Sequence, residues 1–216
     1  VDRPDGDGIA DRPAVAPVSR QAGRRIARRA IVRGLVVPVN STAVERFMQQ
    51  YGGKEMAESW RTVRKNTVQV AQDIPAEHYD YQAAADTMTV AQMLAHMATN
   101  TLWAERLHFV DRKSSVSGED FGRYFSDAGT VAAGLTSKDA IIDALVSHGE
   151  SLALHLERLT DAQLHESVAL PNASKSRFEM LLGVKEHEMH HRAQLMLIER
   201  LLGIVPHLTR ARQQRR

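Results

Sequence analysis

The feature that most constrains the fold is a long apolar stripe interrupted by two histidines. Between residues 180 and 202 the members of this stripe recur in steps of three or four residues, as one face of an α-helix requires. They are Met180, Val184, His187, His191, Leu195, Ile198 and Leu202. Because the two histidines share this stripe one turn apart, we expect both imidazole rings to point into a helical core.

Two buried imidazoles need partners, since an unsatisfied buried polar group costs about 1–3 kcal/mol. A single histidine on an apolar face is usually a core residue with hydrogen bonds to both ring nitrogens. Two imidazoles at positions i and i+4 instead form a ready pair of metal ligands. We therefore interpret His187 and His191 as metal ligands, and we expect His190 to lie on the flank of the same helix.

A metal site of this kind needs at least one more protein ligand, and His96 is the best candidate. It lies in the segment AQMLAHMATN, beside the apolar stripe of a second predicted helix. His155 is the fallback ligand, whereas His108 is expected to face solvent. Three imidazoles leave one or more coordination positions open, which is typical of catalytic rather than purely structural metal sites.

The same segment also matches a protease motif. Residues 187–191 read HEMHH, which fits HExxH with Glu188 as the catalytic base of a metalloprotease. Such a protease also requires strands, and the sequence shows no sheet pattern, so this interpretation is not favoured. Glu188 is expected to pair with Arg192, one turn later, at the edge of a helical bundle.

Apolar periodicity and capping signals predict four helices, near residues 42–74, 87–110, 136–159 and 176–202. The first helix has a possible break at Gly52–Gly53, and Thr87 or Thr89 caps the second. A connection of about 25 residues before the third helix is long, which indicates a functional loop or a crossover. Only residues 168–171, VALP, suggest a short extended segment. Four helices with two long connections predict an all-α four-helix bundle.

The composition limits the chemistry that the chain can perform. The chain has no cysteine, which excludes disulfides, thiolate ligands and a cysteine nucleophile. Its 28 basic and 26 acidic side chains give no argument for a nucleic-acid partner. No apolar run approaches the ~20 residues that a membrane-spanning helix needs. We therefore expect a cytoplasmic protein without a membrane span.

The N-terminal residues differ in composition from the rest of the chain. Residues 1–19 are rich in Pro, Gly and Asp, and six arginines without an acidic residue follow between Arg20 and Arg33. Three interpretations compete, namely a basic arm for nucleic acid or anionic membrane, a transit-like peptide, and a disordered leader upstream of a start at Met48. The arginines lack interleaved aromatic residues, which favours the leader. We predict a low-complexity, disordered or loosely helical extension at 1–41 and a bundle domain at 42–210.

Three segments resemble the DinB-like (damage-inducible protein DinB) family. They are YGGKEMAESWRTVRKNT, TVAQMLAHMATN and RFEMLLGVKEHEMHHRAQLMLIERLLGIVPHL, and the resemblance extends from about Met48 to Leu208. The most specific part, HEMHHRAQ, is similar to the family signature H-x-x-H-H-R-G-Q, with Ala193 in place of glycine. The resemblance implies an up-down-down-up bundle in which His96, His187 and His191 hold a zinc, nickel or iron-like divalent ion.

The resemblance also implies candidate functions. Several relatives are thiol S-transferases or isomerases that use bacillithiol, mycothiol or glutathione, and many are homodimers. The first hypothesis is a metal-dependent enzyme that activates a low-molecular-weight thiol as its thiolate and transfers it to an electrophilic substrate in stress or detoxification. The alternative is a non-catalytic metal-binding stress-response protein. A third hypothesis is association with nucleic acid or membranes through the arginine-rich arm and the C-terminal RARQQRR.

Side chains beside the expected metal site are candidates for orienting its ligands. A ligating imidazole needs an acceptor for its other ring N–H, and Gln194, Asn100 and Glu105 offer amide or carboxylate oxygens. Asn100 is preferred because it lies one turn beyond His96. An open cavity over the three rings would favour a transferase over a protein that only holds the metal.

Overall fold

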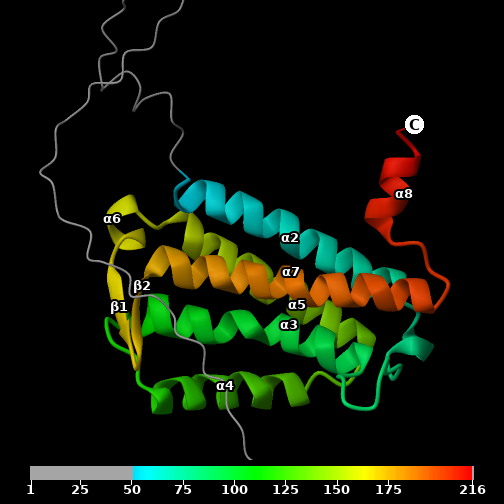
Figure 1. Cartoon of the computed structure of the whole chain (residues 1–216), viewed down its shortest axis with the longest axis horizontal. Coiled ribbons are helices and arrows are strands. Elements are labelled where there is room, and N and C mark those ends of the chain that lie inside the picture. Colours follow the sequence, from blue (N-terminus) through cyan, green and yellow to red (C-terminus); the bar gives the residue numbers. More distant parts are fainter. Residues whose placement is uncertain (1–50, 216) are drawn as a thin grey trace, which may run out of the picture. The chain divides into compact units, whose positions relative to one another are not determined.

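The structure of this chain is a computed structural model that describes residues 51–215 (Figure 1). Three predictions lie outside the described residues. They concern the arginine-rich segment, the domain boundary at residue 42 and the start of the first helix. Within residues 51–215, no helix is long and apolar enough to cross a membrane.

Four long helices form a bundle. They are α2 (Gly53–Asp73), α3 (Val90–Glu105), α5 (Lys138–Glu157) and α7 (Arg177–Leu201). Helices α2 and α3 each pack against both α5 and α7. Helices α2 and α7 run in one direction and α3 and α5 in the other (Figure 1). The all-α, up-down-down-up bundle that the resemblance implies is therefore confirmed.

Local capping sets the helix boundaries close to the predicted ones. Thr89, Ser137 and Ser176 precede α3, α5 and α7, and each side chain accepts a hydrogen bond from the backbone N–H three residues later. Helix α2 begins directly after Gly52. Helix α7 ends shortly before Gly203, whose φ of 79° lies in the left-handed region that commonly closes a helix.

The long connection between α3 and α5 is a crossover that contains a fifth helix, α4 (Gly118–Ala133). Helix α4 packs on α3 and returns the chain so that α5 can run parallel to α3 (Figure 1). The sequence did not predict this helix because only Tyr124 and Ala128 on it are buried. Gly122 and Gly129 also lower its intrinsic helix propensity by about 1 kcal/mol each.

Short elements complete the described residues. They are η1 (Ala76–His78), the π-helical turn η2 (Arg106–Val110), α6 (Asp161–Leu164), β1 (Ser167–Leu170), β2 (Ala173–Ser176) and α8 (His207–Gln213). Strands β1 and β2 form an antiparallel hairpin, so the predicted extended segment is confirmed. Strand β2 was not predicted because ASKS has neither apolar alternation nor β-branched side chains.

The interior of the bundle is apolar along most of its length. One cluster of buried side chains includes Leu94, Leu145 and Leu195, and a second includes Trp60 and Leu152. From the predicted stripe, the structure buries the apolar members Met180, Val184, Leu195 and Ile198 and leaves Leu202 half-buried. The stripe therefore faces the core as its periodicity predicted.

Helix α7 also buries one carboxyl group without a partner. Glu199 is 0% exposed, and neither of its carboxylate oxygens has a hydrogen-bond partner among the described residues. Burial, together with the nearby carboxylate of Asp73, raises the pKa of Glu199 to about 7. Folding therefore favours the protonated form of this side chain.

This burial predicts a pH dependence of stability. The folded-state pKa of Glu199 exceeds its unfolded value of about 4.3. Its contribution to the free energy of unfolding is therefore fully present below a pH of about 4.3 and is lost as the pH rises through 7. We expect Glu199→Gln to lose less stability than the wild type between pH 5 and pH 8, measured by urea unfolding. An identical pH dependence in the two proteins would contradict the buried, partnerless carboxyl group.

Candidate metal centre

The structure brings His96, His187 and His191 together between α3 and α7. One ring nitrogen from each histidine lies within 4.8 Å of those of the other two. The Nε2 atoms of His96 and His187 are 2.7 Å apart. The ring centroids of His96 and His191 are 5.0 Å apart, with the rings nearly perpendicular. These are the three histidines that the sequence proposed as one ligand set.

A glutamine fixes the orientation of one of these rings. The Nδ1 atom of His191 lies 2.8 Å from Oε1 of Gln194. Because an amide oxygen only accepts, Nδ1 carries the hydrogen and Nε2 keeps its lone pair for a metal ion. Gln194 was one of the three predicted supporting residues.

The other two predicted supporting residues form hydrogen bonds with side chains outside the trio. The side-chain oxygen of Asn100 accepts a hydrogen bond from the Trp103 indole, and Glu105 accepts one from the Ser151 hydroxyl. Asn100 was the preferred candidate because it lies one turn from His96. The indole N–H of Trp103, nearly one turn further along α3, donates to its side-chain oxygen instead. Asn100 still lines the cavity beside the three rings.

The surroundings keep the three imidazoles neutral. Burial lowers the pKa of all three side chains, and the neighbouring imidazoles lower it further. The pKa of His187 falls to about 4. Neutral imidazole is the form that binds metal ions, so these pKa shifts favour a trio that could bind one at neutral pH.

The geometry of the trio fits a divalent ion. At Zn–N distances of about 2.0–2.1 Å, tetrahedral coordination places two ligand nitrogens about 3.3 Å apart. The Nε2 atoms of His96 and His187 are 2.7 Å apart, and one nitrogen from each of the three rings lies within 4.8 Å of the others, so these distances bracket that spacing. Three neutral nitrogen donors suit late first-row divalent ions.

A cavity of about 440 Å³ opens over His96 and His187, between α3, α4 and α7. This volume lies within the ~300–1,000 Å³ typical of small-molecule sites. Its walls are mostly apolar and include Trp103, Phe125 and Val184, and the helical glycines Gly129 and Gly183 also line it. Helix α4, which the sequence did not reveal, supplies one wall, so this part of the cavity was missed together with that helix.

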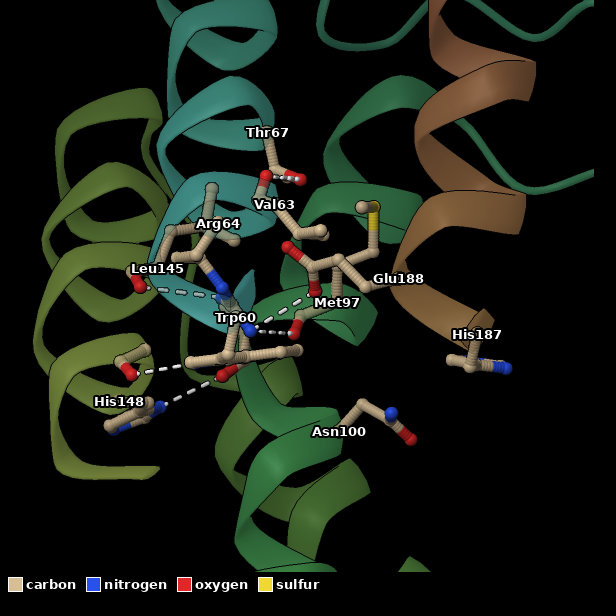
Figure 2. Close-up of polar contacts among 12 residues, drawn as sticks. Trp60, Val63, Arg64, Thr67, Met97, Asn100, Leu145, His148, His187 and Glu188 are labelled. Atoms are coloured by element: carbon tan, nitrogen blue, oxygen red, sulfur yellow. Dashed lines mark hydrogen bonds and ion pairs between the residues drawn. The ribbon is translucent and has the colours of Figure 1, made fainter. Parts of the chain in front are cut away.

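A buried ion pair involves Glu188, the residue that follows His187 on α7. Oε2 of Glu188 is 3.1 Å from Nη2 of Arg64 on α2, and the two side chains are only 2% and 5% exposed. Arg64 also donates to the backbone carbonyls of Met97 on α3 and Leu145 on α5. In Figure 2 the Glu188 carboxylate points toward Arg64, whereas His187 projects away from it. One guanidinium group thus connects all four helices of the bundle.

This pair corrects two interpretations of the HEMHH segment. The predicted pairing of Glu188 with Arg192 is wrong, because Arg192 donates to the backbone carbonyl of Val63 and Glu188 pairs with Arg64. The metalloprotease interpretation also fails, because the carboxylate that would act as base is buried against an arginine. Arg64 on α2, rather than the i+4 neighbour Arg192, pairs with Glu188 because both Arg64 and Glu188 lie inside the bundle.

The remaining histidine predictions are partly correct. His190 is exposed on the flank of α7, as predicted. His108 was expected to face solvent, but it is buried with 4% exposure at the π-helical turn η2, where the 3.6-residue period no longer holds. The fallback ligand His155 stacks on Phe109 and is not part of the trio. Ala193 is exposed, so its methyl group crowds no neighbouring helix.

Comparisons with known proteins agree with this fold. The model of the DinB family matches residues 48–215. The chain belongs to the DinB family. No curated protein matches it. The family assignment therefore rests on the domain as a whole and brings no established activity with it.

Solved structures of similar proteins share the fold at low sequence identity. A DinB-like protein from Bacillus subtilis is 19% identical, with a TM-score of 0.53, over 69% of this chain and 92% of that one. A proposed DinB family member from Exiguobacterium sibiricum is 16% identical, with a TM-score of 0.51, over 70% and 92%. An uncharacterized protein from Clostridium difficile is 15% identical, with a TM-score of 0.53, over 70% and 97%.

The trio predicts a difference between two neighbouring histidines of α7. We expect His187→Ala to weaken divalent-metal binding by more than the roughly 10–100-fold that loss of an outer-shell partner causes, because it removes a direct ligand. His190→Ala, the matched control on the exposed flank, should retain the metal. Elemental analysis of the two purified proteins provides the measurement. Equal metal content in both variants would refute the site.

The Arg64–Glu188 pair predicts unequal roles for two arginines of α2. Arg64→Ala should lower the free energy of unfolding by about 3–5 kcal/mol, because it leaves a buried carboxylate without its partner. Arg61 pairs with Glu150 and Glu157 at the surface, so Arg61→Ala should cost about 1 kcal/mol or less. Chemical denaturation measures the free energy of unfolding of both variants. Similar losses of stability in the two would argue against a buried ion pair.

Proposed function

We propose that this protein is a divalent-metal-dependent enzyme that transfers a low-molecular-weight thiol to an electrophilic carbon of an apolar substrate. The observation that carries the proposal is the cavity of about 440 Å³ over His96 and His187. A protein that only stores or senses a metal has no need for an apolar chamber beside the open coordination positions. The cavity is also the feature that separates the two main hypotheses from the sequence.

The chemistry assigned to the site follows from its donor set. A divalent ion held by three neutral imidazoles would lower the pKa of a thiol well below its usual ~8.5, so that the thiolate forms at neutral pH. The chain has no cysteine, so this thiol must arrive with a substrate. Its sulfur would form the C–S bond, the leaving group would depart with its electron pair, and the thiol proton would pass to solvent.

The residues of the chain have separate tasks in this scheme. The three imidazoles hold the ion, and Gln194 fixes the ring of His191. The mostly apolar walls would lower the polarity around the reacting thiolate, which would strengthen electrostatic interactions there. Trp103 presents an aromatic face on which a flat substrate can pack.

A second cavity gives the other reactant a separate approach. It has a volume of about 360 Å³, contacts His191 and Gln194, and extends along Met93, Leu197 and Leu201. It therefore reaches the trio at a different ring from the first cavity. Two cavities at one centre suit a reaction that joins two molecules, a thiol and an electrophile.

The proposed setting is a cytoplasmic homodimer that acts in stress or detoxification. Leu197 and Leu201 of α7 are each 59% exposed. Large apolar side chains left exposed on one helix are suited to contact with a second copy of the chain, which would then border the second cavity. Non-catalytic metal binding is the alternative that the following experiment decides.

The first cavity can be blocked without touching the metal ligands. Nothing lies within 4 Å of a Cβ placed at Gly183, which lines the cavity. We expect Gly183→Leu to keep its metal but to slow thioether formation by roughly a hundredfold, because the substrate is displaced from the trio. The assay uses metal-loaded protein, a panel of low-molecular-weight thiols and an aryl halide as acceptor.

Gly122→Leu is the matched control, since Gly122 is also helical and open but lies on the exposed face of α4. It should retain the wild-type rate. If metal-loaded wild-type protein turns over no thiol–electrophile pair, the metal-binding alternative replaces the enzyme. If both leucine variants slow the reaction equally, the cavity is not the substrate site.

A further inference from the structure

A second kind of cavity lies at the end of the bundle, where η2, the end of α5 and the start of α7 meet. It has a volume of about 300 Å³ and is polar, unlike the two cavities at the trio. Its charged and imidazole side chains are those of His108, Arg112, His155, Arg158, Glu166 and Arg177. About 18 Å of helical rise along α3 and η2 separates position 108 from position 96, so this cavity is distinct from the metal centre.

The inner wall of this cavity is a buried arginine–histidine contact. Arg177 is 5% exposed, and its Nε donates to Oε2 of Glu166 at 2.7 Å. Its Nη1 lies 3.2 Å from Nδ1 of His108. Because a guanidinium group only donates, Nδ1 of His108 is the acceptor and Nε2 carries the hydrogen. Nη2 of Arg177 makes no hydrogen bond with the described residues.

The Nε2–H of His108 is therefore a hydrogen-bond donor without an acceptor in the described part of the chain. Its Nε2 is buried and has no hydrogen-bond partner within residues 51–215. Burial and the neighbouring Arg177 charge lower the pKa of His108 to about 3, so the ring is neutral at physiological pH. An unsatisfied buried donor costs about 1–3 kcal/mol, and an acceptor atom bound nearby would recover that loss.

Two further arginines in the cavity have no protein partner. Arg112 and Arg158 are both exposed, and neither side chain forms a hydrogen bond or ion pair with the described residues. Among the lining side chains, the positive charges of these two arginines and Arg177 outnumber the single negative charge of Glu166. The cavity is therefore positively charged although the whole chain is nearly neutral.

The backbone at Arg112 is strained. Its φ of 46° makes it the only non-glycine residue with positive φ in the described part of the chain. The Lys113 N–H donates to the Leu107 carbonyl across this residue, which is a helix ending that usually employs glycine. An arginine in this conformation costs roughly 1–2 kcal/mol. Strained residues and π-helical turns such as η2 both concentrate at functional sites.

We propose that this cavity binds a small oxyanion, a phosphate or carboxylate group, through Arg112, Arg158, Arg177 and the Nε2–H of His108. Guanidinium groups bind both anions with paired, charge-assisted hydrogen bonds. Glu166 occupies one edge of Arg177, so the anion takes the free Nη2. The volume lies at the lower limit of small-molecule sites, which matches a small ligand.

Isothermal titration calorimetry of the metal-loaded protein with inorganic phosphate, and separately with acetate, tests this site at constant ionic strength. We expect saturable binding of one anion per chain, and the anion that binds more tightly identifies the phosphate or carboxylate source. Arg158→Ala should weaken binding about tenfold or more, as loss of a charged hydrogen bond predicts. Lys65→Ala, which removes one exposed charge from α2, should change it less than twofold.

Arg112→Gly separates a binding role from a structural one. The glycine relieves the strained backbone, so the variant should melt at a higher temperature than the wild type while binding the anion about tenfold more weakly. His187→Ala should bind the anion as the wild type does, because the trio is a separate site. The proposal is overturned if neither anion binds saturably, or if Arg158→Ala and Arg112→Gly bind as tightly as Lys65→Ala.

Discussion

The buried contact between Arg64 and Glu188 is the interaction on which the position of the candidate metal centre depends. Because Glu188 is held inside the bundle by Arg64, the neighbouring His187 projects in a different direction from α7 (Figure 2). The same guanidinium group contacts the backbone of α3, which carries His96. The pair thus sets the rotation of α7 relative to α3. Burying two charges is costly, and the additional backbone hydrogen bonds of Arg64 offset that cost.

The sequence predicted the features that local periodicity encodes. The three- and four-residue steps of α7 predicted its buried face, and His96 joined the trio because it lies beside a similar stripe. Contacts between distant segments were not predictable in this way. The i+4 rule suggested Arg192 as the partner of Glu188, although the actual partner comes from another helix. Helix α4 has few buried residues, and the π-helical turn places His108 where a 3.6-residue period does not.

The bundle separates two kinds of chemistry. Two mostly apolar cavities meet at the trio of imidazoles, and the proposed thiol transfer would take place there. A polar cavity with three arginines lies at the other end of α3, around a histidine whose Nε2–H has no partner in the described chain. The net charge of +2 conceals this contrast, because composition averages over the whole chain and a cavity depends on only a few residues.

X-ray absorption spectroscopy at the edge of the bound metal tests the central claim most directly, because it observes the ligand atoms themselves. For zinc-loaded protein, this account predicts nitrogen ligands at about 2.0–2.1 Å, with the multiple-scattering pattern of three imidazoles. In the His187→Ala variant that pattern should weaken or disappear. A first shell of oxygen atoms without imidazole scattering in the wild-type protein would contradict the assignment of His96, His187 and His191 as the metal centre.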